Sequence, residues 1–291
     1  MGSGIAESVA VSGLPVVVRD VDHASVARAG TRIEDSLQRA VRRGKLDAAA
    51  AREVRDRIEL TTDISPVSAA DLVIEAVPEQ EQLKLEVMHL IDEVVADRAI
   101  IASNTSSIPI AELAQAIRHP MRVLGLHFFS PVPVMNLVEV VIALDTSAET
   151  VSVAKAFVGQ IGKCAIETKD RSGFIVNMLL VPYLMAAVRM FEEGFASRED
   201  IDTGMRLGCG HPMGPLRLCD FIGLDVLYAV CDSLYEEFKR DEYAPPPLLK
   251  RMVASGRLGE KSGRGFYDYT AASNGAARAV PANLRPAGER Q

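Results

Sequence analysis

The first half of the chain alternates short apolar runs with amphipathic stretches, and this alternation limits the possible folds more than any other feature. The apolar runs are rich in β-branched residues and carry few polar ones, as expected of strands that are buried on both faces. They lie at residues 15–20, 72–76, 99–103, 123–128 and 136–143, with helical patterns between them at 22–43, 79–95 and 108–117. An α/β fold with a doubly wound parallel sheet is therefore predicted.

The second half of the chain reads as helices alone. Helical patterns occupy residues 174–193, 197–207, 224–239 and 246–255, and no convincing strand follows Gly173. The helix at 174–193 is apolar on most faces, which predicts burial in a core or in a subunit interface. We expect a first domain at 1–168, an all-helical domain at 169–269 and a disordered tail at 270–291, which is rich in Ala, Asn, Pro and Gly.

Charge and composition exclude several classes of function. The 291 residues carry a net charge of −7 without a long basic run, so nucleic acid is not an expected partner. No apolar run approaches the ~20 residues of a membrane helix, and the N-terminus lacks the charged start and the cleavage site of a signal peptide. The four cysteines have no Cys-x-x-Cys spacing and no interleaved histidines. We expect a cytoplasmic protein with reduced thiols and no metal site.

The N-terminal region carries signals of a dinucleotide site. Asp20 ends the strand-like run P-V-V-V-R-D, where a carboxylate can accept the ribose hydroxyls of NAD and repel the 2′-phosphate of NADP; alternatively, it only caps the next helix. The opening M-G-S-G-I-A-E looks like the end of a G-x-G-x-x-G motif, with Gly2 as its third glycine. The strand and the two glycines that precede such a glycine are absent, which would leave two neighbouring strands without a partner. We therefore expect Met1 to be an internal residue of a longer product.

The stretch H-F-F-S-P-V-P-V-M-N-L-V-E, from His127 to Glu139, carries the most specific chemical signal. His127 follows an apolar strand, at the edge where doubly wound sheets bind their ligands. Glu139 lies inside another apolar strand, and a carboxylate buried there needs a partner. Glu139 would hold one imidazole nitrogen of His127 while the other faces a substrate hydroxyl. A purely structural pair is the alternative interpretation.

Each of three other polar features has two possible interpretations. The motif S-N-T-S-S, from Ser103 to Ser107, is either a helix cap or a set of donors for a substrate alcohol or the nicotinamide ribose. Asn177, in an apolar helix, is either a satisfied core amide or an active-site donor. The basic cluster at 42–45 is either a solvated helix end or a small anion site.

Together these motifs resemble the L-3-hydroxyacyl-CoA dehydrogenase family, and within it the stand-alone bacterial 3-hydroxybutyryl-CoA dehydrogenases. The matching motifs cover residues 1–269: M-G-S-G-I-A-E at Met1, V-V-V-R-D at Val16, D-L-V-I-E-A at Asp71, S-N-T-S-S at Ser103, H-F-F-S-P-V-P-V-M-N-L-V-E-V at His127, G-F-I-V-N at Gly173, H-P-M-G-P-L at His211, D-F-I-G-L-D at Asp220 and K-S-G-R-G-F-Y-D-Y at Lys261. The resemblance implies a Rossmann-like domain, a helical domain that forms a homodimer, and reversible oxidation of a 3-hydroxyacyl-CoA to a 3-ketoacyl-CoA with NAD.

The resemblance also implies roles for particular residues. His127 would be the base in oxidation and Glu139 its orienting partner, while Ser106 and Asn177 would bind the reacting oxygen or polarise the histidine. Asp20 would bind the adenosine ribose. The other residues assigned to the cofactor are Gly2, Gly4, Glu79, Lys84, Ser106, Ser130 and Lys261. The residues assigned to the acyl-CoA substrate are Ser36, Arg43 and Ser106, and an arginine suits a CoA phosphate.

One departure from the family pattern and three competing functions remain at this point. Ser130 stands where the family usually has Asn in H-F-F-N-P, and serine reaches less far. The first function is a 3-hydroxybutyryl-CoA dehydrogenase of fatty-acid metabolism, as in β-oxidation, or of butyrate-type metabolism. The second is a 3-hydroxyadipyl-CoA dehydrogenase of aromatic-acid breakdown. The third is a non-catalytic, truncated homologue that keeps the dimer interface but cannot bind NAD.

Overall fold

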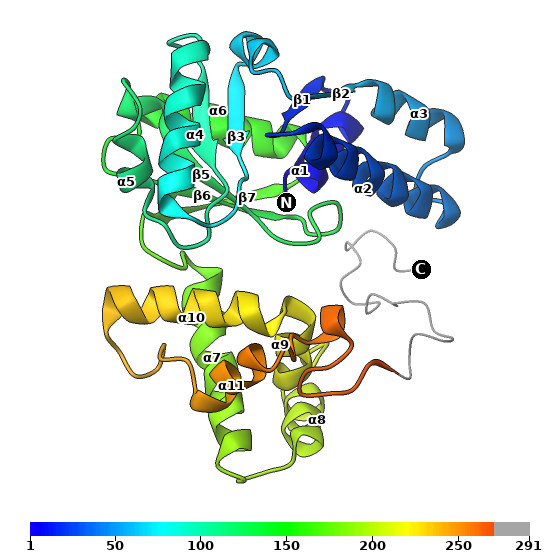
Figure 1. Cartoon of the computed structure of the whole chain (residues 1–291), viewed down its shortest axis with the longest axis vertical. Coiled ribbons are helices and arrows are strands. Elements are labelled where there is room, and N and C mark those ends of the chain that lie inside the picture. The colour runs from blue at the N-terminus through cyan, green and yellow to red at the C-terminus, as the bar shows by residue number, and fades with distance from the viewer. Residues whose placement is uncertain (271–291) are drawn as a thin grey trace. The chain divides into compact units, whose positions relative to one another are not determined.

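A computed structural model describes residues 1–270, so the tail expected from residue 270 onward lies, except for its first residue, outside the described part. The chain divides into two units, one at Met1–Phe174 and one that begins at Ile175 (Figure 1). Within the described residues, no helix has both the length and the apolar character needed to cross a membrane.

The N-terminal unit contains two sheets. Its strands are β1 (Val16–Arg19), β2 (Ile58–Thr61), β3 (Leu72–Glu75), β4 (Ile100–Ser103), β5 (Val123–Phe128), β6 (Leu137–Ile142) and β7 (Cys164–Lys169). β1 pairs with β2, and the other five form a sheet in the order β3-β4-β5-β6-β7. β1 and β3 therefore belong to separate sheets. The sheets are parallel except between β5 and β6.

The antiparallel pairing of β5 with β6 departs from the parallel sheet that the sequence predicts. The segment 129–136 that joins the two strands is too short for the crossover helix that parallel strands require, so the chain turns back on itself. The consequence is a fixed register in which His127 lies directly opposite Glu139. The two sequence positions are thus brought together by the turn and not by the parallel part of the sheet.

Helices cover both faces of the five-stranded sheet (Figure 1). The helices of this unit are α1 (Gly2–Val11), α2 (His23–Arg42), α3 (Ala48–Asp56), α4 (Glu81–Val94), α5 (Ile110–Ala114) and α6 (Ala148–Gln160), with 3₁₀ segments η1 (Ser65–Ala69) and η2 (Pro120–Arg122). Alternate strand residues belong to two cores. Ile101 and Val123 pack with α4 and α5, while Ile100 and Leu124 pack with α1 and α6. This doubly covered arrangement is the Rossmann-like organisation that the wholly apolar strands predict.

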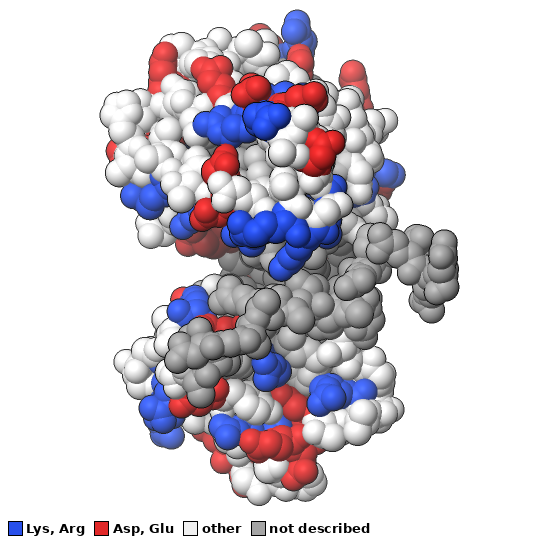
Figure 2. All heavy atoms as spheres, turned by 90° about the vertical axis from the view of Figure 1, so that its right-hand side faces the viewer, with Lys and Arg blue, Asp and Glu red and all other residues white. Residues whose placement is uncertain are grey.

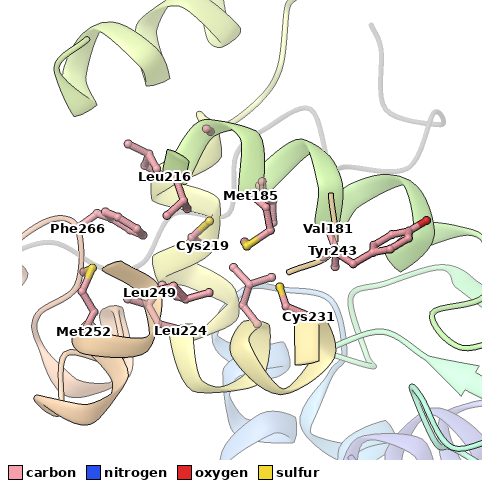
Figure 3. Close-up of a cluster of buried hydrophobic side chains, with 14 of the residues drawn as sticks. Val181, Met185, Leu216, Cys219, Leu224, Cys231, Tyr243, Leu249, Met252 and Phe266 are labelled. Atoms are coloured by element: carbon pink, nitrogen blue, oxygen red, sulfur yellow. The ribbon is translucent and has the colours of Figure 1, made fainter. Parts of the chain in front are cut away.

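The described part of the unit that begins at Ile175 is helical. Its described elements are α7 (Val176–Glu192), α8 (Arg198–Gly208), α9 (Pro215–Ile222), α10 (Leu224–Phe238), α11 (Pro247–Ala254) and the 3₁₀ segment η3 (Glu260–Ser262). The side chain of Ser197 accepts the backbone N–H of Asp200 and so caps α8. Figure 3 shows Val181 and Met185 of α7 facing Leu224 and Cys231 of α10 in one apolar core.

Candidate active site

The β5–β6 hairpin brings a histidine and a carboxylate into contact. Directly opposed residues of an antiparallel pair project from the same face of the sheet, so His127 and Glu139 meet. Nδ1 of His127 lies 2.7 Å from Oε2 of Glu139. His127 is 5% exposed and Glu139 is fully buried. The buried carboxylate thus has the partner that its apolar strand predicts.

A serine occupies the other side of the imidazole. Oγ of Ser106 lies 3.1 Å from Nε2 of His127. Because a carboxylate only accepts, Nδ1 carries the hydrogen toward Glu139, which leaves Nε2 as an acceptor for the Ser106 hydroxyl. The three side chains therefore hold the imidazole in a fixed orientation, in which Nε2 of the neutral ring is the nitrogen that can take up a proton.

The loop that carries Ser106 is held at several points. The side-chain oxygen of Asn104 accepts the backbone N–H of Phe128, which ties the end of β4 to the end of β5. Oε1 of Glu79 accepts the Thr105 hydroxyl at 2.6 Å and the backbone N–H groups of Ser106 and Ser107 at 2.9 and 3.0 Å. Glu79, which the family resemblance assigns to the cofactor, thus contacts the S-N-T-S-S loop directly.

The charge state of Glu79 follows from its surroundings. Burial raises the pKa of Glu79, but the hydrogen bond from Thr105, the charge of Lys84 and the N–H group of Ser106 outweigh this effect. The net result is a pKa below the ordinary value of a glutamate. Glu79 is therefore an anion at neutral pH, which is the form that can accept all of these donors.

Glu75 lies at the end of β3, is 2% exposed and was not among the predicted site residues. Its carboxylate accepts two contacts from Nζ of Lys84, at 2.8 and 3.0 Å, and the Ser103 hydroxyl at 2.6 Å. Lys84 is itself 1% exposed. The only signal in the sequence is one acidic residue at the end of an apolar run, followed nine positions later by a lysine.

Two phenylalanines pack against the histidine and were also missed. The ring centroid of Phe129 lies 4.7 Å from that of His127, and the centroid of Phe174 lies 5.4 Å away. Phe174 has a backbone φ of 49°, in the left-handed region that non-glycine residues rarely adopt. Such conformations gather at functional sites, where the surrounding structure holds them. The two rings leave a largely apolar surrounding for the imidazole.

The residues assigned to the cofactor in the first strands and helix lie near one edge of the N-terminal unit. Asp20 follows β1 at its carboxyl end and accepts the backbone N–H of Val21. A short turn joins the end of α1 to the start of β1, so the helix runs antiparallel to the strand. The first residues of α1 therefore lie at the carboxyl end of β1. A Cβ added at Gly4 would lie 3.1 Å from Cβ of Val132, whereas one at Gly2 would have an ordinary contact at 3.8 Å. Gly4 thus packs closely against Val132, and a larger residue there would have to displace that side chain by a few tenths of an ångström.

Two of the three positions assigned to the substrate, Ser36 and Arg43, lie in or directly after α2. Oγ of Ser36 donates a hydrogen bond to Oε1 of Glu7, so this hydroxyl is engaged within the protein. Arg43, directly after α2, is exposed. The exposed basic residues along this helix and the following turn are Arg28, Arg32, Arg39, Arg42, Arg43 and Lys45. Figure 2 faces the side where α2 and α3 lie and shows Lys and Arg gathered there on the N-terminal unit.

The remaining assigned residues are spread over both units. Ser130 is exposed in the β5–β6 turn, where it precedes Pro131 in a cis peptide bond. Asn177 lies in the first turn of α7, and Lys261 forms an ion pair with Asp225 in the helical unit. The described residues contain no group of three or more side chains suited to hold a metal ion.

Two family models together match almost the whole described chain. The family model for the NAD-binding domain of 3-hydroxyacyl-CoA dehydrogenase matches residues 1–171, and the model for the C-terminal domain matches residues 173–269. A 3-hydroxybutyryl-CoA dehydrogenase of Mycobacterium tuberculosis is 50% identical over 271 residues, which cover 92% of this chain and 95% of that protein.

Solved structures give the same result. A crystal structure of M. tuberculosis FadB2 has 50% identity and a TM-score of 0.91, over 92% of this chain and 95% of that one. The crystal structure of (S)-3-hydroxybutyryl-CoA dehydrogenase PaaH1 from Ralstonia eutropha has 45% identity and a TM-score of 0.88, over 93% of this chain and 95% of that one.

Proposed function

Because the chain belongs to the 3-hydroxyacyl-CoA dehydrogenase family, we propose that it is an NAD-dependent oxidoreductase that interconverts a short-chain (3S)-3-hydroxyacyl-CoA and the 3-ketoacyl-CoA. The substrate that we propose is 3-hydroxybutyryl-CoA, since relatives of 50% and 42% identity carry that activity in their names. The observation that carries the proposal is the imidazole of His127, held between Glu139 and Ser106.

The protein's own groups account for the proton transfer. During oxidation, Nε2 of His127 accepts the proton of the 3-hydroxyl, and the bond from Ser106 is free to shift to the substrate oxygen. Glu139 keeps the ring oriented through Nδ1 and stabilises the imidazolium that forms. In reduction the same nitrogen returns the proton to the new alkoxide. General-base assistance of this kind contributes about 10²–10⁴ in rate.

The residues present fit a dinucleotide. The close packing at Gly4 brings the amino end of α1 to the carboxyl edge of the strands, and a helix amino end attracts phosphate. We propose that this end holds the pyrophosphate and that Asp20 accepts the adenosine ribose hydroxyls. We assign Gly2, Glu79, Lys84, Ser130 and Lys261 to the remainder of the cofactor site. Bound there, NAD would supply the acceptor for the hydride from C3 of the substrate.

The acyl-CoA substrate needs a cationic surface for its phosphates. We propose that Arg43 and the neighbouring basic residues of α2 supply it, since exposed guanidinium groups pair well with phosphate oxygens. Ser36 would contribute only as an acceptor, because its hydroxyl hydrogen is directed to Glu7. Asn177 remains our candidate for a second donor to the reacting oxygen.

We also propose a homodimer formed through α7 and α8. Leu179, Phe195 and Leu207 are 73%, 78% and 75% exposed. Leu179 and Leu207 share helix faces with the residues of an apolar hollow of about 360 Å³, lined by Tyr183, Ala186, Ala187, Met190, Ala196, Asp200, Ile201, Gly204, Met205 and Pro215. A second copy suits this surface, because a two-fold contact lets one apolar face cover its equal.

Light scattering tests the dimer. We expect Leu179→Glu and Leu207→Glu to shift the protein to the monomer mass. Leu144→Glu, at a leucine that is 93% exposed in the N-terminal unit, is the matched control and should leave the dimer intact. A wild-type monomer, or dimers that persist in both variants, would contradict this interface.

We place the reaction in the cytoplasm, in fatty-acid metabolism such as β-oxidation. The test of the proposed function is NADH formation from NAD and (3S)-3-hydroxybutyryl-CoA, compared with 3-hydroxyadipyl-CoA by kcat/KM. We expect the short thioester to be preferred. Preference for the adipyl thioester would change the substrate, and failure to bind NADH in a direct titration would refute the enzymatic proposal for this chain.

A further inference from the structure

The ammonium group of Lys163 has no acidic partner among the residues that the structure describes. The side chain is half-buried, and burial lowers the pKa of the ammonium. Nζ donates to two backbone carbonyls instead, that of Val132 at 2.7 Å and that of Met135 at 2.8 Å. Taking a charge out of water is costly unless hydrogen bonds compensate for it. Lys163 thus serves the turn between β5 and β6, and no step of the proposed reaction uses it.

The connection between α6 and β7 fixes the backbone of Lys163. Gly162, directly before it, has a φ of 72°, in the left-handed region that glycine adopts without strain. The N–H of Lys163 donates to the carbonyl of Val158, which completes a Schellman motif at the end of α6. On the other side, the N–H of Cys164 donates to the carbonyl of Asn136, directly before β6. The lysine is therefore presented from a backbone that is held on both sides, next to the end of the turn.

The turn that Lys163 holds lies against the first turn of α1. A Cβ added at Gly4 would lie 3.1 Å from Cβ of Val132 and 3.4 Å from Cδ of Pro133. Val132 is 3% exposed and belongs to the same apolar core as Ile5 of α1. The carbonyl that accepts from Lys163 and the side chain that faces Gly4 thus belong to one residue, Val132.

The other backbone bonds of the turn shape it internally. The N–H groups of Val134 and Met135 both donate to the carbonyl of Pro131. Lys163, by contrast, links the turn to the α6–β7 connection. The register that puts His127 opposite Glu139 belongs to the strand ladder and not to the turn. Loss of the ammonium should therefore release the turn without separating the catalytic pair.

We propose that Lys163 is a positioning residue for the cofactor, which fixes the β5–β6 turn so that Val132 and Pro133 hold the amino end of α1 in place. The inference rests on the proposed function, which assigns that helix end to the pyrophosphate of NAD. Ser130, also assigned to the cofactor, lies in the same turn. The role requires no contact between the ammonium and the dinucleotide. Loss of Lys163 should therefore weaken dinucleotide binding more than it lowers kcat.

The test compares two variants of Lys163 with a matched control. Lys163→Met removes the ammonium and keeps an unbranched side chain. Lys163→Arg is the conservative variant, because a guanidinium can donate to both carbonyls. The control is Lys155→Met, since Lys155 also belongs to this region of α6 but pairs with Glu167 on the surface.

A second control separates loss of stability from loss of position. Asp92 is 2% exposed near the end of α4 and pairs with Arg118 and Arg122. Asp92→Asn should lower Tm but leave the β5–β6 turn undisturbed. It therefore shows how far a less stable fold alone weakens the binding of NADH.

A double-mutant cycle tests the route through Val132. Val132→Ala shortens the side chain that faces Gly4. If Lys163 acts through that side chain, the two substitutions disturb one contact. Their effects on the Kd for NADH should then fail to multiply in the double variant.

The readouts are the Kd for NADH well below the lowest Tm, kcat at saturating substrates, and hydrogen exchange of the peptide 130–136. We expect Lys163→Met to raise the Kd about tenfold, which corresponds to about 1.4 kcal/mol. Lys163→Arg and both controls should stay within about threefold, and kcat should stay within about threefold in the Lys163 variants. Only Lys163→Met should exchange faster than the wild type in the peptide 130–136.

Several results would overturn the inference. These are a wild-type Kd in Lys163→Met, an equal loss of affinity in Asp92→Asn, Kd effects that multiply with Val132→Ala, and a kcat that falls more than the Kd rises. If the wild-type protein binds no NADH, the proposed function fails. Hydrogen exchange then decides alone whether Lys163 holds the turn, and unchanged exchange in Lys163→Met would refute it.

Discussion

Replacing Glu139 by glutamine removes the charge beside His127 and preserves the shape of the side chain. The glutamine oxygen can still accept the hydrogen on Nδ1, so the ring keeps its orientation. What is lost is the stabilisation of the imidazolium that forms when Nε2 takes up the substrate proton. Glu139→Gln therefore measures the contribution of the carboxylate charge to proton transfer.

The size of the effect follows from the burial and the distance. Glu139 is fully buried, and its Oε2 lies 2.7 Å from Nδ1 of His127. Two unit charges with centres about 4 Å apart interact by about 4 kcal/mol at an effective dielectric constant of about 20. Since about 1.36 kcal/mol corresponds to a tenfold change in rate, kcat should fall about 10³-fold.

The assay is the initial rate of NADH formation at saturating NAD and acyl-CoA, together with NADH affinity by titration. NADH affinity should stay within about threefold of the wild type, because Glu139 is enclosed behind the histidine. Asp92→Asn is the control for loss of a buried carboxylate. A Glu139→Gln variant that keeps kcat within about threefold of the wild type, or a control that loses as much, would refute the reasoning.

Three further predictions follow from other contacts. The lowered pKa of Glu79 means that its anion stabilises the fold above the ordinary glutamate value of 4.5 and that this contribution is lost as the pH falls below it. Glu79→Gln should therefore show a shallower fall of Tm between about pH 5 and 3 than the wild type, and equal slopes would contradict this. Gly125→Ala should lower the free energy of unfolding by about 1–3 kcal/mol in urea titrations, because the new Cβ would lie 2.7 Å from Cβ of Val141. An unchanged urea midpoint would contradict this, because it would mean that β5 and β6 can move apart at little cost. Asp20→Asn should reduce the preference for NAD over NADP in kcat/KM by about tenfold, and a constant ratio would remove Asp20 from the ribose site.

The strands of the five-stranded sheet were predictable where both of their faces are buried. β4 and β5 lie wholly in the core, so every residue except His127 is apolar or small and the run is visible in the sequence. β2 and β7 were missed because they alternate with polar or exposed positions, as in C-A-I-E-T-K, where the pattern merges with that of a loop. α3 and α6 were also missed. α6 has little contrast between its faces, and α3 is short and buries a single residue, Val54.

The candidate site was predictable in its chemistry and only partly in its geometry. A buried carboxylate in an apolar strand demands a partner, and this argument alone pairs Glu139 with His127. The antiparallel turn that puts the two residues in register depends on the short segment 129–136. The prediction of a wholly parallel sheet did not take the length of this segment into account. Glu75 escaped notice because its significance lies in contacts to Lys84 and Ser103, which are distant in sequence. Contacts of this kind arise from tertiary packing and leave no local pattern.

The most direct test of the account is the turnover of His127→Gln. Glutamine fills a similar volume at this position but cannot take up a proton at neutral pH. The account predicts a fall in kcat of about 10²–10⁴ on 3-hydroxybutyryl-CoA, with NADH affinity within about threefold of the wild type. Turnover at the wild-type rate would contradict the assignment of His127 as the group that accepts the substrate proton.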